Sequence, residues 1–148
     1  MMNIEELKDM QRKHHYSFVA NSPDYLYTAN NSGTTPILYK AVKHRYYFKD
    51  AVILECRVGK ATAILLARSQ IKYLHAHIMS KPAKELLQRY GICFTYDHEV
   101  EYIENVCKDG ICSLEEYLLD IDDLDEGFKV IVKCLTESMS SMMWKLTA

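Results

Sequence analysis

Long hydrophobic runs, basic runs and an excess of either charge are all missing from this 148-residue chain. Its longest apolar stretches, residues 51–54 and 61–67, are far shorter than the ~18 residues that would suggest a membrane span. With a formal net charge of -2, the chain lacks the excess of basic residues that is typical of a strong non-specific nucleic-acid binder. The acidic, polar N-terminus lacks the basic and apolar regions of a secretory signal. We therefore expect one cytoplasmic domain that binds neither a membrane nor nucleic acid.

The usual cofactor and metal motifs are missing as well. The five glycines form no G-x-G-x-x-G turn, and Gly59-Lys60 lacks the earlier glycine and the following hydroxyl residue of a P-loop. Without a C-x-x-C spacing, the five cysteines are expected to be free thiols in a reducing cytosol. They are Cys56, Cys93, Cys107, Cys112 and Cys134. We expect no cofactor and no metal.

What the sequence does contain is a regular alternation of helical and extended patterns. Asn3 is a suitable N-cap for a helix that reaches about His14, and the strands 16–20 and 25–29 are joined by turn residues. A second helix begins with Thr35 as N-cap and Pro36 at its first position. Further strands are expected at 51–54, 73–79 and 92–96. Further helices are expected at 61–67 and from the opening Ser80-Lys81-Pro82 to Tyr90.

The last third of the chain shows a weaker pattern. Ser113 to Glu116 has the spacing of a capping box, and an acidic stretch over 120–126 leads into a final helix whose apolar residues keep a helical period. The fold class that follows is a three-layer α/β/α domain. We expect residues 1–118 to form it, and residues 119–148 to be an acidic linker and helix, in the same globule or as a dimer element.

Four short motifs stand out within residues 4–118. They are Gly33-Thr34-Thr35-Pro36, Glu55-Cys56-Arg57-Val58-Gly59-Lys60-Ala61, the helix from Lys81 to Tyr90 closed by Gly91, and Gly110-Ile111-Cys112 before Glu115. With these motifs the chain resembles a family of uncharacterised prokaryotic domains that have a cytidine-deaminase-like fold. It departs from the family pattern in having Glu55 for Asp and Ser113 for Pro.

The resemblance implies a mixed five-stranded sheet, with a ligand site at the helix starts near Thr35 and Gly59. True deaminases carry H-x-E or C-x-E and P-C-x-x-C at these starts, to bind zinc and to move protons. Neither motif occurs in this chain. Deaminase activity is therefore not expected, and whether the protein is an enzyme stays open.

Two cations, Arg57 and Lys60, lie beside the expected helix start at Gly59. Because unpaired N–H groups and the helix dipole favour an anion there, something negative should compensate. One alternative is Glu55 as an internal salt-bridge partner, and the other is a bound phosphate or carboxylate. The candidate ligand-binding residues are Thr34, Thr35, Glu55, Arg57 and Lys60.

Cys56 and Cys112 are candidate reactive thiols. Cations beside Cys56 can lower the pKa of a thiol, but the sequence shows no assisting base, and a packed structural cysteine is the alternative. His75 and His77 alternate along one expected strand and so point to one face, as part of a metal site or as packed side chains.

Three functional hypotheses remain. The first is a non-zinc domain that binds a small anionic or nucleotide-like ligand at the two helix starts. The second is an interaction domain without a small-molecule site, in which the final helix, with Met139, Met142 and Met143, forms a homodimer or binds a partner. The third is a thiol-dependent enzyme that uses Cys56 or Cys112.

Overall fold

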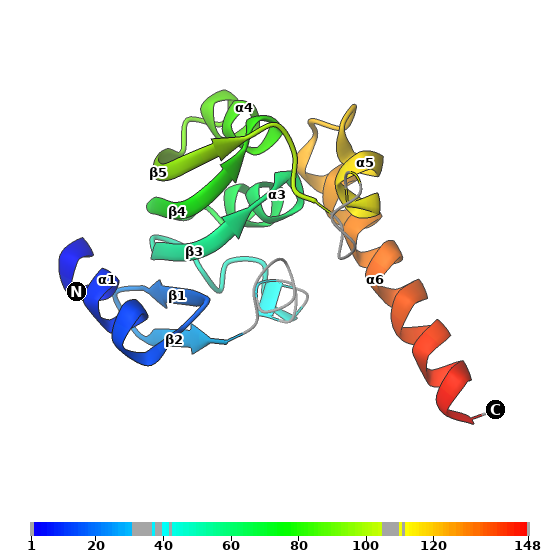
Figure 1. Ribbon diagram of the computed structural model, residues 1–148, viewed down its shortest axis with the longest axis horizontal. Coiled ribbons are helices and arrows are strands. Elements are labelled where there is room, and N and C mark those ends of the chain that lie inside the picture. Colours follow the sequence, from blue (N-terminus) through cyan, green and yellow to red (C-terminus); the bar gives the residue numbers. More distant parts are fainter. Residues whose placement is uncertain are drawn as a thin grey trace.

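A mixed five-stranded sheet forms the centre of the protein in a computed structural model (Figure 1). The structure describes residues 2–30, 37, 40, 41, 43–104, 110 and 112–147, and the side chains of the last helix as far as residue 137. The strands are β1 (Phe18–Asn21), β2 (Leu26–Ala29), β3 (Val52–Val58), β4 (Tyr73–Ser80) and β5 (Cys93–Val100). Their order is β2-β1-β3-β4-β5; β1 is antiparallel to β2 and β3, while β3, β4 and β5 are parallel. The predicted α/β class and mixed sheet are confirmed, and the cytidine-deaminase-like detail stays a prediction.

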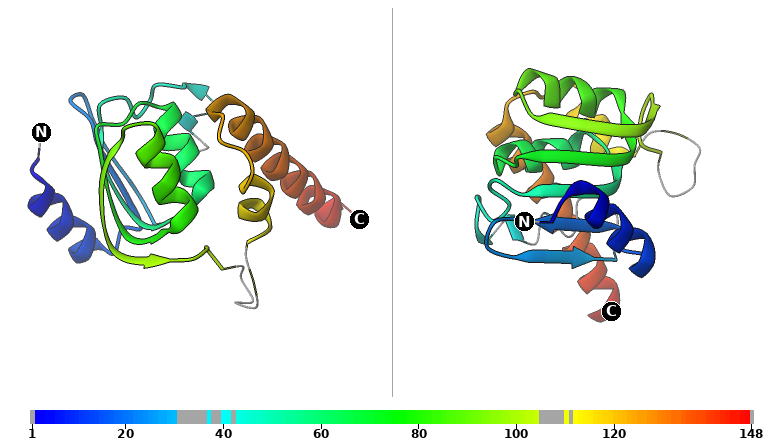
Figure 2. Two further views of the ribbon diagram at one scale, coloured as in Figure 1. Left: turned by 90° about the horizontal axis from the view of Figure 1, so that it is seen from above. Right: turned by 90° about the vertical axis from the view of Figure 1, so that its left-hand side faces the viewer.

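Helices cover both faces of this sheet (Figure 2). On one face lies α1 (Ile4–His14), whose buried Leu7 packs against Val19 of β1 and Leu54 of β3. On the other face, α3 (Lys60–Arg68) and α4 (Lys81–Arg89) pack over a larger core that includes Phe18 and Ile53. Residues alternate between the two cores along β1 and β3, as the two-residue period of a strand requires.

Local sequence signals account for the start of α1 and for both ends of α4. The Asn3 side chain accepts the N–H of Glu6 at the start of α1, and Ser80 accepts the N–H of Ala83 at the start of α4. Gly91 follows α4 with φ +69°, a conformation that favours glycine. The predicted helix ending near His44 is helical at residues 37, 40, 41 and 43, while its predicted start lies outside the described residues.

Two helices complete the chain, α5 (Ser113–Leu118) and α6 (Leu124–Thr147). Ser113 is the first residue of α5 and Cys112 its N-cap, one position earlier than the predicted cap. The beginning of α6 packs against α3 and α5, and Ile131 is buried in the larger core. Figure 1 shows the far end of α6 extending away from the sheet. None of the helices whose placement is described has the length and apolar content that a bilayer crossing demands.

Candidate functional site

The start of α3, where sequence reasoning expected an anion, holds a carboxylate of the protein itself. Glu115 of α5 accepts the backbone N–H groups of Lys60 at 2.7 Å and of Ala61 at 3.3 Å. The Lys60 ammonium, buried with 4% of its side chain exposed, donates to the Leu119 carbonyl and to Asp122 Oδ1, both at 3.0 Å. Burial raises the pKa of Glu115, while the two backbone N–H groups act in the opposite direction. The compensating negative charges therefore come from Glu115 and Asp122.

Gly59 allows this close contact. A Cβ atom at this position would lie 2.3 Å from Glu115 Oε1, far inside van der Waals contact. The glycine of the sequence motif is thus explained by the approach of α5 to the start of α3.

The structure gives the other predicted ligand-binding residues different surroundings. Glu55 is buried, and its Oε1 accepts the N–H of Cys56 at 3.0 Å. Arg57 is exposed and lines an opening of about 420 Å³ together with acidic side chains, whereas Lys60 pairs with Asp122 and not with the expected Glu55. The other residues of this opening are Ile78, Val100, Glu101, Tyr102 and Glu104. Thr34 and Thr35 lie outside the described residues.

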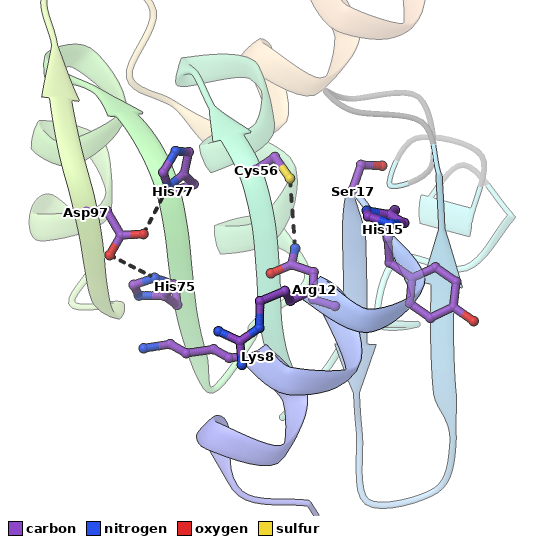
Figure 3. A pocket seen from close by; sticks show the side chains of 10 residues that line it. Lys8, Arg12, His15, Ser17, Cys56, His75, His77 and Asp97 are labelled. Atoms are coloured by element: carbon purple, nitrogen blue, oxygen red, sulfur yellow. Dashed lines mark hydrogen bonds and ion pairs between the residues drawn. The ribbon is translucent and has the colours of Figure 1, made fainter.

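A larger cavity, of about 730 Å³, lies between α1 and the sheet (Figure 3). The end of α1 and the segment after it form one wall, and side chains of β3, β4 and β5 form the floor. The lining residues are Lys8, Gln11, Arg12, His15, Tyr16, Ser17, Cys56, His75, His77 and Asp97. We call this cavity the α1 pocket.

The floor of the α1 pocket contains a histidine–carboxylate cluster. Asp97 of β5 contacts His77 Nδ1 at 3.0 Å and His75 Nε2 at 3.5 Å. Its hydrogen bond with His77 lowers the pKa of Asp97, while burial, followed by the charge of Lys8, lowers the pKa of His75. His75 Nδ1 also lies 2.7 Å from the Thr95 hydroxyl. The predicted placement of both histidines on one face is confirmed.

Cys56 lies on the same floor, half-buried, with Gln11 Nε2 at 4.0 Å from its sulfur. Burial raises the pKa of its thiol and Glu55 raises it further, although sequence reasoning expected nearby cations to lower it. The other candidate thiol, Cys112, is half-buried at the start of α5, where its backbone N–H donates to the Ile103 carbonyl. Cys56, Cys93, Cys112 and Cys134 are free, and Cys107 lies outside the described residues.

Sequence reasoning missed three charged residues of the α1 pocket: Lys8, Arg12 and Asp97. The spacing of Lys8 and Arg12 on a predicted helix places them on one side of it. Asp97 was missed because the last strand was expected to end at Tyr96, whereas β5 continues to Val100. Across the parts of the chain that the structure describes, no group of three or more His, Cys, Asp or Glu residues has an arrangement that could hold a metal ion.

The architecture defines an α/β domain with an open mixed sheet. The chain belongs to the family described as TM1506, a domain of unknown function (DUF1893), whose model matches residues 6–135. A crystal structure of a DUF1893 family protein (TM1506) from Thermotoga maritima is similar, with 24% sequence identity and a TM-score of 0.76. The match covers 90% of this chain and 92% of that chain, and at this identity it shows the fold alone. No curated protein matches the chain. The predicted membership of an uncharacterised family is confirmed.

Proposed function

We propose that this domain binds a small anionic ligand in the α1 pocket. The observation that carries the proposal is the charge of the lining: the Lys8 ammonium and the Arg12 guanidinium line a cavity in which Asp97 is the one carboxylate among the lining residues. This local excess of basic groups occurs in a chain with a net charge of -2. The volume of about 730 Å³ lies within the range of roughly 300–1,000 Å³ that is typical of small-molecule sites.

The two cations are available to a ligand. Lys8 lies 3.8 Å from Glu5, and Arg12 pairs with Asp9, each within one turn of α1. Exposed pairs of this kind contribute about 0–1 kcal/mol, so an incoming phosphate or carboxylate can replace them at little cost. The ring of Tyr16, which also lines the pocket, offers an apolar surface to a ligand as large as a nucleotide.

This location differs from the helix starts that the sequence suggested. At the start of α3, the N–H donors and the Lys60 ammonium already have carboxylate partners in Glu115 and Asp122. A ligand there would have to displace Glu115 from a tightly packed contact. The α1 pocket requires no such displacement.

Thermal unfolding with inorganic phosphate and with adenosine 5′-monophosphate tests the proposal. A ligand at 100 times its dissociation constant should stabilise the fold by about 2.7 kcal/mol. We expect Lys8→Ala to reduce the stabilisation, while Lys13→Ala, a control on the same helix but outside the pocket lining, keeps it. Lys60→Ala should also keep the response. Equal responses in the parent, Lys8→Ala and Lys13→Ala would contradict a site in the α1 pocket, and loss only in Lys60→Ala would place the site at α3.

A second candidate function is self-association through α6. The far end of this helix extends away from the sheet (Figure 1), and the family match ends at residue 135. Beyond that point the sequence keeps apolar residues at helical spacing: Met139, Met142, Met143 and Leu146. A short helical segment of this composition gains stability chiefly from packing, and a second copy of the chain offers it the same surface.

A further inference from the structure

The sheet aligns a thiol, an imidazole and a carboxylate across three neighbouring strands. The pairs Glu55–Ala76 and Arg57–Ile78 place Cys56 of β3 opposite His77 of β4. In the same way, the pairs Ala76–Tyr96 and Ile78–His98 place His77 opposite Asp97 of β5. Neighbouring strands are roughly 4.8 Å apart. Cys56, His77 and Asp97 all line the α1 pocket, so they share one face as well as one level (Figure 3).

The central residue of this row is oriented as a base would be. His77 Nδ1 lies 3.0 Å from Asp97 Oδ2, a contact that keeps the ring proton on Nδ1 and leaves Nε2 as the acceptor. Asp97 and Cys56 come from the two strands on either side of β4, so the strand register places them on opposite sides of the His77 backbone. The His77 side chain is 58% exposed, which leaves it accessible to a substrate and to water.

Gln11 adds a hydrogen-bond donor next to the thiol. Its Nε2 lies 4.0 Å from Cys56 Sγ, on the side of the pocket that α1 forms. An amide donor beside a nucleophilic sulfur is suited to a carbonyl oxygen that becomes negative when the sulfur attacks its carbon. Burial and then Glu55 raise the pKa of the Cys56 thiol, so a neighbouring base is needed to activate it.

We infer that Cys56, His77, Asp97 and Gln11 form a hydrolytic site for a small carboxylic ester or thioester. Its acyl part carries an anionic group, which Lys8 and Arg12 hold; this last point rests on the proposed function. Cys56 is the nucleophile, His77 is the general base and acid, and Gln11 stabilises the oxyanion. Asp97 is a positioning residue that acts through His77.

The reaction balances with water as the co-substrate. Cys56 Sγ bonds to the carbonyl carbon while its proton passes to His77 Nε2. The tetrahedral intermediate then collapses, the C–O or C–S bond to the leaving group breaks, and the leaving group takes the proton from His77. A water molecule, deprotonated by His77, attacks the resulting thioester of Cys56. The carboxylic acid leaves and the thiol recovers its proton from His77.

Hydrolysis of two synthetic esters by the full chain tests this inference. The neutral probe is p-nitrophenyl acetate, and the anionic probe is mono-p-nitrophenyl succinate. With the neutral ester we expect acetylation of Cys56, detected by peptide mass spectrometry, and nitrophenol release that Cys56→Ser abolishes. His77→Ala should slow acylation roughly 10²-fold, the usual contribution of a general base. Asp97→Asn should lower the rate and shift its pH profile.

Two control variants separate this site from background reactivity. Cys93→Ser removes an exposed thiol and His14→Ala removes an exposed imidazole, both outside the α1 pocket, so neither should change the rate. Nitrophenol release that is equal in the parent and Cys56→Ser would overturn the inference. Release that depends on Cys56 but not on His77 would also overturn it.

The two esters also separate the hydrolytic site from the proposed function. Because p-nitrophenyl acetate carries no anionic group, its hydrolysis does not depend on Lys8. Lys8→Ala should therefore lower kcat/KM only for the succinate ester. If both esters react through Cys56 and His77 but Lys8→Ala affects neither, the anion-binding part fails and the hydrolytic site stands. If phosphate stabilises the chain through Lys8 but neither ester reacts, the hydrolytic site fails alone.

Discussion

The Glu115 carboxylate accepts hydrogen bonds from the first two backbone N–H groups of α3. Replacing it by alanine leaves the buried N–H groups of Lys60 and Ala61 without their acceptor and opens space beside Gly59. We expect Glu115→Ala to lower the free energy of unfolding by about 3 kcal/mol, because each unpaired buried donor costs roughly 1–3 kcal/mol. Glu115→Gln keeps nearly the same shape and one of the two acceptor oxygens, so its loss should be smaller. Urea denaturation measures both, and equal losses in the two variants would contradict this role.

A comparison of the parent protein with Glu115→Gln also gives a prediction about pH. Burial raises the pKa of Glu115 above its ordinary value of 4.5, so the folded state binds more protons than the unfolded state at pH values between the ordinary pKa and the raised pKa. The free energy of unfolding contributed by this group therefore falls as the pH rises from about 4.5 through the raised pKa. Glu115→Gln has no such group. We expect its stability relative to the parent to increase over this interval in urea titrations, and an unchanged difference would contradict the raised pKa.

The sequence identified individual residues at the start of α3 and in the α1 pocket, but it did not identify their partners. The motif around Gly59 and Lys60 correctly marked a helix start that needs a negative charge. The charge comes from Glu115, 55 positions away along the chain, and a local pattern does not show which acid closes such a contact. Cys56 and His77 were both noticed in the sequence, but their alignment with Asp97 depends on strand register. Register follows from packing of the whole sheet.

At the scale of elements, local chemistry was the better guide. The cap at Asn3 and the helix opening at Ser80-Lys81-Pro82 correctly predicted where α1 and α4 begin, and in both a side-chain oxygen satisfies an N–H group within the same turn. Strand ends were predicted less well. β5 continues to Val100, past the expected end at Tyr96, although Asp97, His98 and Glu99 are polar and exposed. Pairing with β4, rather than the local apolar pattern, supports this extension.

The crossing of α6 over α3 yields a prediction for Gly127. A Cβ atom there would lie 2.8 Å from Ile64 Cδ1, so the two helices approach more closely than a larger residue permits. Alanine favours a helix over glycine by about 1 kcal/mol, but overpacking costs roughly 1–3 kcal/mol. We expect Gly127→Ala to lower the free energy of unfolding by about 1 kcal/mol in urea denaturation.

A double-mutant cycle isolates the contact responsible. Ile64→Val removes the Cδ1 atom and alone should cost about 1 kcal/mol. If the contact between position 127 and Cδ1 sets the cost of Gly127→Ala, the double variant is less destabilised than the sum of the single variants. Strictly additive losses would show that the cost arises elsewhere.

For the whole molecule, the unusual feature is the length of α6. Its first turns complete the core through Ile131, which is buried against the rest of the domain. The remainder continues as a helix to Thr147 and extends away from the body (Figure 2). An isolated helical segment shorter than about 12–15 residues is marginal in water, so packing against another surface would stabilise it. A homodimer through α6 supplies that surface without a second gene product.

We expect the full chain to have twice its 17.2 kDa mass in light scattering at micromolar concentration. Replacing Met139 and Met142 by aspartate introduces charge into the apolar stripe and should yield a monomer, because burying an unpaired carboxylate in a helix interface is strongly unfavourable. Ser140→Asp with Ser141→Asp adds the same charge at neighbouring polar positions of the same helix and should leave the dimer intact. Circular dichroism and urea denaturation check that the core of each variant remains folded. A parent chain that is monomeric, or a dimer that both double variants dissociate equally, would show that the methionine stripe of α6 does not form the interface.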